Sequence, residues 1–327
     1  MLSRVFKRET APQTTERALG FDWRQYMVFI AFLAIFTFFA IVLYDSGFLS
    51  FYNLLNVVRQ SAIIAVMAVA MTFVISAAEI DLSVGSVAGL ASVTSALAVS
   101  EYGLFAGVAA GLLTGVIVGG INGILVAAIS IPSFLVTLGM LGIAVGSAMW
   151  ITDSAPVPIV NNAFNNTFGS GQIGPVPSLL LWVVILLAVG HVVLRKTTYG
   201  RQVLATGGAE SAARFSGVNT RRIKFYVLLV SGTVAGLAGM LYAGRLHSGR
   251  FQWGEGDELS VIAAVILGGT SLFGGYGTVI GSVIGALLVG LINNGLTLMG
   301  LEFSQQQIVR GAIIILAVAL ARKGPRT

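Results

Sequence analysis

The sequence predicts an all-α membrane protein, a polytopic bundle of about ten transmembrane helices, and three observations indicate this fold class. Hydrophobic residues make up 56% of the 327 residues and charged residues only 10%, against about 25% charged residues in an ordinary soluble domain. The mean hydropathy is +0.91. Glycine occurs 41 times and proline 7 times, and glycine inside apolar helices allows close helix packing. This composition excludes a water-soluble globular domain.

The expected spans follow from the length that crosses the hydrocarbon layer, about 20 mainly apolar residues. They are 26–44, 54–76, 83–100, 104–129, 131–152, 178–194, 225–243, 259–275, 279–298 and 306–321. The region 54–129 is nearly continuously apolar, and Glu79, Asp81 and Glu101 mark its divisions. Within it, 54–100 fits either two full spans or a span with a re-entrant segment.

Basic residues indicate the orientation, because short cytoplasmic segments carry the excess of Lys and Arg. Three clusters stand out: Arg4, Lys7, Arg8, Arg17 and Arg24; Arg195, Lys196, Arg201, Arg214, Arg221, Arg222 and Lys224; and Arg322, Lys323 and Arg326. We therefore expect a cytoplasmic N-terminal segment (1–25), one transmembrane domain (26–321) with a cytoplasmic loop at 195–224, and a cytoplasmic tail (322–327). Both termini are then cytoplasmic, and the net charge of +6 reflects topology and not nucleic-acid binding.

A stripe of glycines marks the expected span 104–129. Glycine recurs at every fourth position, at Gly107, Gly111, Gly115, Gly119 and Gly123. Residues four apart lie on one helix face, so the stripe forms a groove in which another helix can pack closely. Static helix packing is the first interpretation, and a surface that slides during conformational change is the alternative.

Short strings recur between the two halves of the chain. Residues 81–84, Asp-Leu-Ser-Val, resemble 258–261, Glu-Leu-Ser-Val, and residues 119–123 resemble 290–295. In the expected topology the two matching spans run in opposite directions, which predicts an inverted repeat of two five-helix halves. Inverted repeats are typical of transporters, with a substrate path at their interface. The alternative is chance similarity in a biased composition.

Polar residues near the spans supply the candidate functional groups. Asp81 and Ser83 precede a span, where they suit a helix cap or a gate. Asn122, Asn293 and Asn294 lie within spans, where they can bond between helices or line a path for a neutral polyhydroxyl solute. No carboxylate is expected at a span centre, which argues against an ion-driven carrier.

Metal and thiol chemistry have few candidate ligands in this sequence. The chain has no cysteine and two histidines, at His191 and His247, which lie far apart in the sequence. No metal site is therefore expected.

The segment 195–224 is the only long polar stretch between expected spans. Its centre predicts a short helix that begins after Gly207-Gly208 and ends at Gly217, because glycine commonly ends helices. Small residues, one acid, one base and Phe215 suit docking into a groove on a partner. A plain solvated loop is the alternative.

Several strings resemble a known family. Residues 79–85, Glu-Ile-Asp-Leu-Ser-Val-Gly, resemble the signature Gly-Ile-Asp-Leu-Ser-Val-Gly of permease subunits of ABC importers for monosaccharides such as ribose and xylose, with Glu79 in place of the usual glycine. Further matches lie at 212–214, 216–219, 262–271 and 293–295. The resemblance covers most of the chain, from about 50 to 320.

This resemblance implies a function and a set of partners. It implies a permease in the bacterial inner membrane that pairs with a second copy of itself, with a cytoplasmic ABC ATPase and with a periplasmic sugar-binding protein. The segment matching 207–219 resembles the region that contacts the ATPase. The residues given this coupling role are Glu210, Ser211, Ala212, Ala213, Arg214 and Gly217.

The chain itself lacks the means to hydrolyse ATP by the usual phosphate-binding loop. It contains no Gly-x-x-x-x-Gly-Lys-Ser/Thr sequence, the loop that cradles nucleotide phosphates. We therefore expect a transport subunit, not an enzyme, with no cofactor of its own and with ATP and Mg held by the partner. The expected cargo is a neutral monosaccharide. The alternatives are a branched-chain amino-acid ABC permease and, less favoured, a secondary carrier or a membrane-embedded enzyme.

Overall fold

The computed structural model describes residues 27–321 and is 76% helical. The expected cytoplasmic segment 1–25 and tail 322–327 lie outside the described residues. The elements in chain order are α1 (Met27–Val42), the 3-10 helix η2 (Tyr44–Ser46), α2 (Phe51–Ser76), α3 (Val84–Tyr102), α4 (Leu104–Ala127), α5 (Ser133–Thr152), β1 (Val157–Pro158), α6 (Asn162–Phe168), β2 (Gln172–Ile173), β3 (Val176–Pro177), α7 (Ser178–Lys196), α8 (Thr198–Gly208), α9 (Glu210–Phe215), α10 (Thr220–Leu246), β4 (Ser248–Gly249), α11 (Asp257–Leu267), α12 (Val279–Leu298) and α13 (Phe303–Ala321).

The expected fold class, an all-α membrane protein, is confirmed. Within the described residues, seven helices are long and apolar enough to cross a membrane: α2, α3, α4, α5, α7, α10 and α12. The helix α1 has 16 residues, and its apolar part, Val28–Val42, is shorter than these seven. The expected span 259–275 is wrong in extent, because α11 has only 11 residues and ends at Leu267. Gly268 caps it, and Gly269 follows with a φ of +90°, which an α-helix does not accept.

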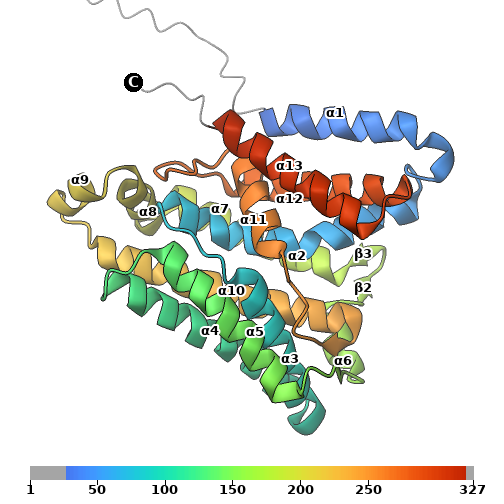
Figure 1. The fold of residues 1–327 in the computed structure, drawn as a ribbon, viewed down its shortest axis with the longest axis horizontal. Coiled ribbons are helices and arrows are strands. Elements are labelled where there is room, and N and C mark those ends of the chain that lie inside the picture. The colour runs from blue at the N-terminus through green and yellow to red at the C-terminus, as the bar shows by residue number, and fades with distance from the viewer. Residues whose placement is uncertain (1–26, 322–327) are drawn as a thin grey trace, which may run out of the picture.

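The helices form one elongated bundle with distinct ends (Figure 1). The helices α8 and α9 lie at one end, and α6 with the short strands β2 and β3 lies at the other. Along one side run α1 and α13, and along the opposite side run α4 and α5. The helix α10 lies between these sides and packs on α4, α3 and α2. The strands are two-residue pairs, β1 with β4 and β2 with β3, both antiparallel.

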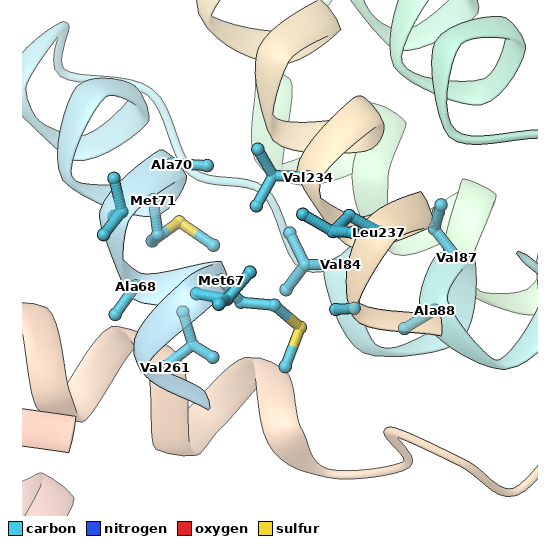
Figure 2. Packing of buried hydrophobic residues seen from close by; sticks show 14 of the residues in the cluster. Met67, Ala68, Ala70, Met71, Val84, Val87, Ala88, Val234, Leu237 and Val261 are labelled. Carbon is cyan, nitrogen blue, oxygen red and sulfur yellow. The ribbon is translucent and has the colours of Figure 1, made fainter. Parts of the chain in front are cut away.

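The apolar core lies where α2, α3, α10 and α11 meet (Figure 2). Met67 and Met71 of α2 face Val84, the first residue of α3, and Val261 of α11. All four are at most 2% exposed. The start of α3 therefore lies in the middle of the packed interior and not at its edge.

The hydrogen bond between Asp81 and Ser231 of α10 shows how far inside the bundle α3 begins. An α-helix rises about 1.5 Å per residue, so Ser231 lies about 16 Å from Thr220, roughly two fifths of the way along α10. The Ser231 hydroxyl donates to Asp81 Oδ2 at 2.7 Å, three residues before α3 begins. The segment 77–83 thus enters the bundle from the end that holds α8 and α9, and α3 starts near mid-depth. Asp81 is therefore a buried carboxylate, although it lies in the loop before α3 and not within a helix.

The segment before α11 enters the bundle from the opposite end. A side chain built on Gly249 would strike Ser92 of α3, and one built on Gly254 would strike Gly85, in the first turn of α3. The chain therefore runs along α3 toward its start, and α11 begins beside it. After α11, Gly274 and Gly275 pack on α8 at Gly207 and Gly208. From neighbouring starts, α3 and α11 leave the middle in opposite directions (Figure 1).

The glycine stripe of α4 faces other helices. All five of its glycines are buried, and a Cβ atom added to Gly115 would lie 2.2 Å from the carbonyl oxygen of Gly232 on α10. The reverse also holds, because a Cβ atom on Gly232 would lie 2.5 Å from the carbonyl oxygen of Gly115. The backbones of α4 and α10 are in direct contact at this crossing, because neither Gly115 nor Gly232 carries a side chain.

This crossing predicts a position-specific penalty. We expect Gly115→Ala to lower the stability of the purified protein in detergent by about 1–3 kcal/mol, because the added methyl group forces two backbones apart. Gly120→Ala is the matched control, since its Cβ atom would meet only Leu229 Cδ1, at 3.8 Å. Thermal unfolding of both variants measures the difference. Equal unfolding temperatures for the two would contradict the close contact.

Candidate coupling face and central polar cluster

The short helix expected between Gly208 and Gly217 is present as α9. It comprises Glu210–Phe215 and lies at the end of the bundle, between α8 and α10 (Figure 1). Gly217 ends it with a φ of +86°, and the amide of Val218 then donates to the carbonyl of Ala213 at 3.0 Å. A left-handed glycine with such a bond closes the last helical turn.

The candidate coupling residues divide between the two faces of α9. Ala213 is only 5% exposed and so points into the bundle, whereas Ser211, Ala212 and Arg214 are exposed. Phe215 is 94% exposed, which is unusual for a phenylalanine. An open hollow at this tip is lined by Glu210, Ser211, Arg214 and Phe215. The outer face thus combines charge with an exposed aromatic ring, and Ala213 anchors the helix from behind.

A network of charges attaches α9 to the bundle. Glu210 Oε1 accepts from Arg214 Nη2 at 3.0 Å and from the Thr220 hydroxyl at 3.1 Å. Lys224 Nζ lies 2.9 Å from Glu210 Oε2 and 2.8 Å from Glu79 Oε1. One ammonium group therefore joins two carboxylates from segments more than 100 residues apart in the sequence.

The Glu79–Lys224 ion pair is a contact of this site that sequence reasoning missed. The signal was present, because an acidic residue in an apolar region requires a partner. Lys224, which directly precedes the expected span 225–243, belongs to the basic cluster in the expected loop 195–224. Only the fold shows that loop 77–83 and the first turns of α10 meet.

The charge network predicts a dependence of α9 mobility on pH. The hydrogen bond from Lys224 holds the pKa of the Glu210 carboxyl below its usual range, with Thr220 and Arg214 acting in the same direction. The pKa of Glu210 is lower in the folded protein than in the unfolded chain. The network therefore contributes its full stabilisation at pH values above the ordinary glutamate pKa of about 4.3 and loses it as the pH falls below that value. We expect a spin label on Ser211→Cys, in a chain with no natural cysteine, to gain mobility in that acid range.

The control for this measurement is the same label with Glu210→Gln. This variant carries no titrating carboxyl at position 210, so its label should already be mobile at neutral pH and should lack the acid transition. Electron paramagnetic resonance spectra of the purified protein give both mobilities. A label on the otherwise unchanged chain that keeps one mobility from pH 7 to pH 3 would contradict the role of the network.

A second polar cluster surrounds Asp81 at mid-depth. Asp81 is 1% exposed, and its Oδ1 accepts from the amide of Ser83 at 2.9 Å and from the Ser83 hydroxyl at 2.6 Å. Its Oδ2 accepts from Ser231 of α10, and Asn122 of α4 donates to the Ser83 hydroxyl at 3.0 Å. The cluster joins loop 77–83, α3, α4 and α10, so the carboxylate fixes the place where α3 begins.

The geometry at Asp81 and Ser83 differs in detail from the expected helix cap. Ser83 occupies the cap position of α3, but its side chain makes no capping hydrogen bond to the helix. Asp81 instead accepts from the amide two residues later, the pattern of an Asx turn. The hydroxyl of Ser86 donates to the Ser83 carbonyl at 2.9 Å. Asp81 therefore binds Ser83, the residue at the cap position of α3, and does not cap the amides of the first helical turn.

The three candidate path asparagines lie at two separate helix contacts. Asn122 belongs to the Asp81 cluster, whereas Asn294 of α12 exchanges two hydrogen bonds with Asn53 of α2, at 2.9 and 3.0 Å. Asn293 is half-buried next to it. The helix α4 packs on α3, α10 and α5, and α12 packs on α2, α11, α7 and α1. Asn122 and Asn294 each link a pair of helices in this structure, and the fold does not bring them together.

The fold and the site define a class of protein. A bundle of apolar helices, two helices that begin at mid-depth and an exposed face at one end that combines charge with an aromatic ring are typical of a multi-pass membrane transport subunit. The chain belongs to the family described as branched-chain amino acid transport system / permease component, which matches residues 53–318.

Relatives with specific names match along most of their length. The probable ABC transporter permease protein YphD of Escherichia coli is 44% identical over 273 residues, 83% of this chain and 82% of that protein. The ribose import permease protein of Haemophilus influenzae is 40% identical, over 96% of this chain and 97% of its own. The L-arabinose transport system permease protein of Escherichia coli is 36% identical, over 93% and 92%. No solved structure matches the chain.

Proposed function

We propose that this chain is the permease subunit of an ATP-driven importer that carries a neutral monosaccharide across the bacterial inner membrane. The observation that carries the proposal is the near full-length similarity to relatives named for ribose and L-arabinose. The family description names branched-chain amino acids, so that cargo is the second candidate. Similarity over more than 90% of both chains favours the sugar.

The proposed assembly contains partners that supply energy and cargo. Two copies of the chain form the path, a pair of cytoplasmic ABC ATPases binds ATP and Mg, and a periplasmic binding protein delivers the sugar. Both termini and the segment 195–224 face the cytoplasm, in agreement with the concentration of basic residues there. The chain itself performs no catalysis.

The proposed mechanism is alternating access driven through α9. Closure of the ATPases on ATP displaces α9, whose exposed face, with Arg214 and Phe215, docks on them. The displacement reaches the bundle through the buried side of α9 at Ala213 and through the Glu210–Lys224 pair. The helices then part on the outer side and accept the sugar.

We also propose ten membrane crossings arranged as an inverted repeat, one of them made by the short helix α11 together with the segment that precedes it. The first half would comprise α1 to α5, and the second half α7 and α10 to α13. In this division α3 and α11 are both the third helix of their halves, and they carry the matching strings at 81–84 and 258–261. Their opposite directions from a common mid-depth start support the proposal, because an inverted repeat requires them.

Reconstitution tests the function. The chain is inserted into proteoliposomes with its ATPase and binding protein, and uptake of labelled ribose, L-arabinose and leucine is measured with and without internal ATP. We expect accumulation of a sugar that depends on both ATP and the binding protein. Accumulation of leucine alone would indicate a branched-chain amino-acid permease. Accumulation of sugar without ATP would indicate a secondary carrier.

A further inference from the structure

The segment that leads into α3 is attached to α10 at two points. Glu79 bonds Lys224 at 2.8 Å, and Asp81 bonds Ser231 at 2.7 Å. Lys224 and Ser231 are seven residues apart, so they share a face of α10 and are separated by about 10 Å along its axis. Glu79 and Asp81 are two residues apart, a separation of at most about 7 Å. The segment therefore lies along α10.

The attachment point at Lys224 also holds α9. Lys224 bridges Glu79 and Glu210, so its ammonium group is the shared contact between α9 and the segment entering α3. The pair is more enclosed than an ordinary surface ion pair, because the Glu79 side chain is 9% exposed and that of Lys224 is 21% exposed. Removal of Lys224 would leave the enclosed Glu79 charge without compensation, which costs more than loss of a surface pair. Removal of Glu79 leaves Lys224 paired with Glu210.

We propose that Glu79 is a positioning residue that couples α9 to the start of α3 through Lys224. This inference rests on the proposed function. When α9 moves, Lys224 moves with Glu210, and the bond to Glu79 carries the movement to the segment 79–81 and to the Asp81 cluster. Without the Glu79 charge, the segment keeps its bond to α10 through Asp81 and its bonds to Ser133 and Thr137 of α5. It loses its link to α9, so ATP hydrolysis proceeds with less movement of α3.

The test measures sugar imported per ATP hydrolysed in the reconstituted complex. We expect Glu79→Gln to lower this ratio by about fivefold or more, the size of an ordinary coupling energy between sites, while basal ATP hydrolysis persists. Lys224→Arg keeps a cation between both carboxylates and should retain the ratio. Glu101→Gln removes an exposed carboxylate at the far end of α3 and is the control for loss of negative charge.

A second measurement needs no partner and separates this inference from the proposed function. A spin label on Ala78→Cys, an exposed position, should gain mobility with Glu79→Gln and not with Glu101→Gln. If Glu79→Gln does not insert, Glu79→Asp tests the same bond, because it keeps the charge and draws the carboxylate back from Lys224 while the contact of Lys224 with Glu210 remains. An unchanged label and an unchanged ratio would each overturn the inference. Failure of the unmodified complex to import any sugar would instead overturn the proposed function.

Discussion

Replacement of Ala213 by tryptophan is expected to abolish sugar uptake while the subunit remains in the membrane. Ala213 is 5% exposed and is the residue through which α9 rests on the bundle. An indole ring has no room there, so α9 must lift away, and the Glu210–Lys224 contact at 2.9 Å must lengthen. The helix itself can still form, because its exposed face is unchanged. We expect uptake to fall by at least about tenfold, with ATP hydrolysis no longer stimulated by loaded binding protein.

The matched control for this variant is Ala213→Ser. Serine adds one oxygen atom and no ring, so α9 should stay packed against the bundle, and uptake should remain near the level of the unmodified protein. Insertion of both variants is checked by membrane extraction and by size-exclusion chromatography in detergent. If Ala213→Trp retained uptake, the packing of α9 against the bundle would not be required for coupling. Equal loss in Ala213→Ser would point to the methyl surface and not to bulk.

Loss of Asp81 is expected to give the largest fall in stability. Asp81→Ala removes the acceptor for the Ser83 amide, the Ser83 hydroxyl and the Ser231 hydroxyl, all in a buried place. Unsatisfied buried donors cost about 1–3 kcal/mol each, and together we expect a loss of about 3–5 kcal/mol. Uptake should be lost as well, because α3 no longer has a fixed starting point.

Two further variants separate the cluster from general loss of charge. Asp81→Asn keeps one oxygen acceptor for Ser83 and can still bond the Ser231 hydroxyl, so its destabilisation should be smaller than that of Asp81→Ala. Asp45→Ala removes an exposed acid in η2 and should leave the unfolding temperature unchanged. Thermal unfolding in detergent measures all three. An unfolding temperature of Asp81→Ala within a degree of that of Asp45→Ala would contradict the role assigned to the cluster.

The sequence was sufficient for the features that depend on local pattern. Hydropathy gave the helical membrane fold, Gly208 and Gly217 gave the limits of α9, and the spacing of glycines gave a face on α4 that the fold buries. The matching strings 81–84 and 258–261 predicted two helices running in opposite directions, and α3 and α11 do so. The limits of α9 and the glycine face of α4 are each encoded within about 25 consecutive residues, so one window of sequence is enough to show them. The matching strings need only the comparison of two such windows.

Features that depend on depth or on distant contacts could not be predicted in this way. Hydropathy counts apolar residues but does not register a break, so the apolar residues after Gly268 extended the expected span beyond the end of α11. The mid-depth position of Asp81 depends on Ser231, 150 residues away. In the same way, the partners of Lys224 lie on two other segments. Such contacts exist only once the helices have packed.

The shared starting level of α3 and α11 has an electrostatic consequence. The first turn of a helix carries about half a positive charge from its free amide groups, so two such ends near each other inside the bundle would attract anions and repel cations. Each end is provided with acid: Asp81 bonds the amide at the start of α3, and Asp257 and Glu258 lie in the first turn of α11. The positive ends of the two helices are thereby offset by carboxylates from the same segments, and no outside anion is needed to balance them.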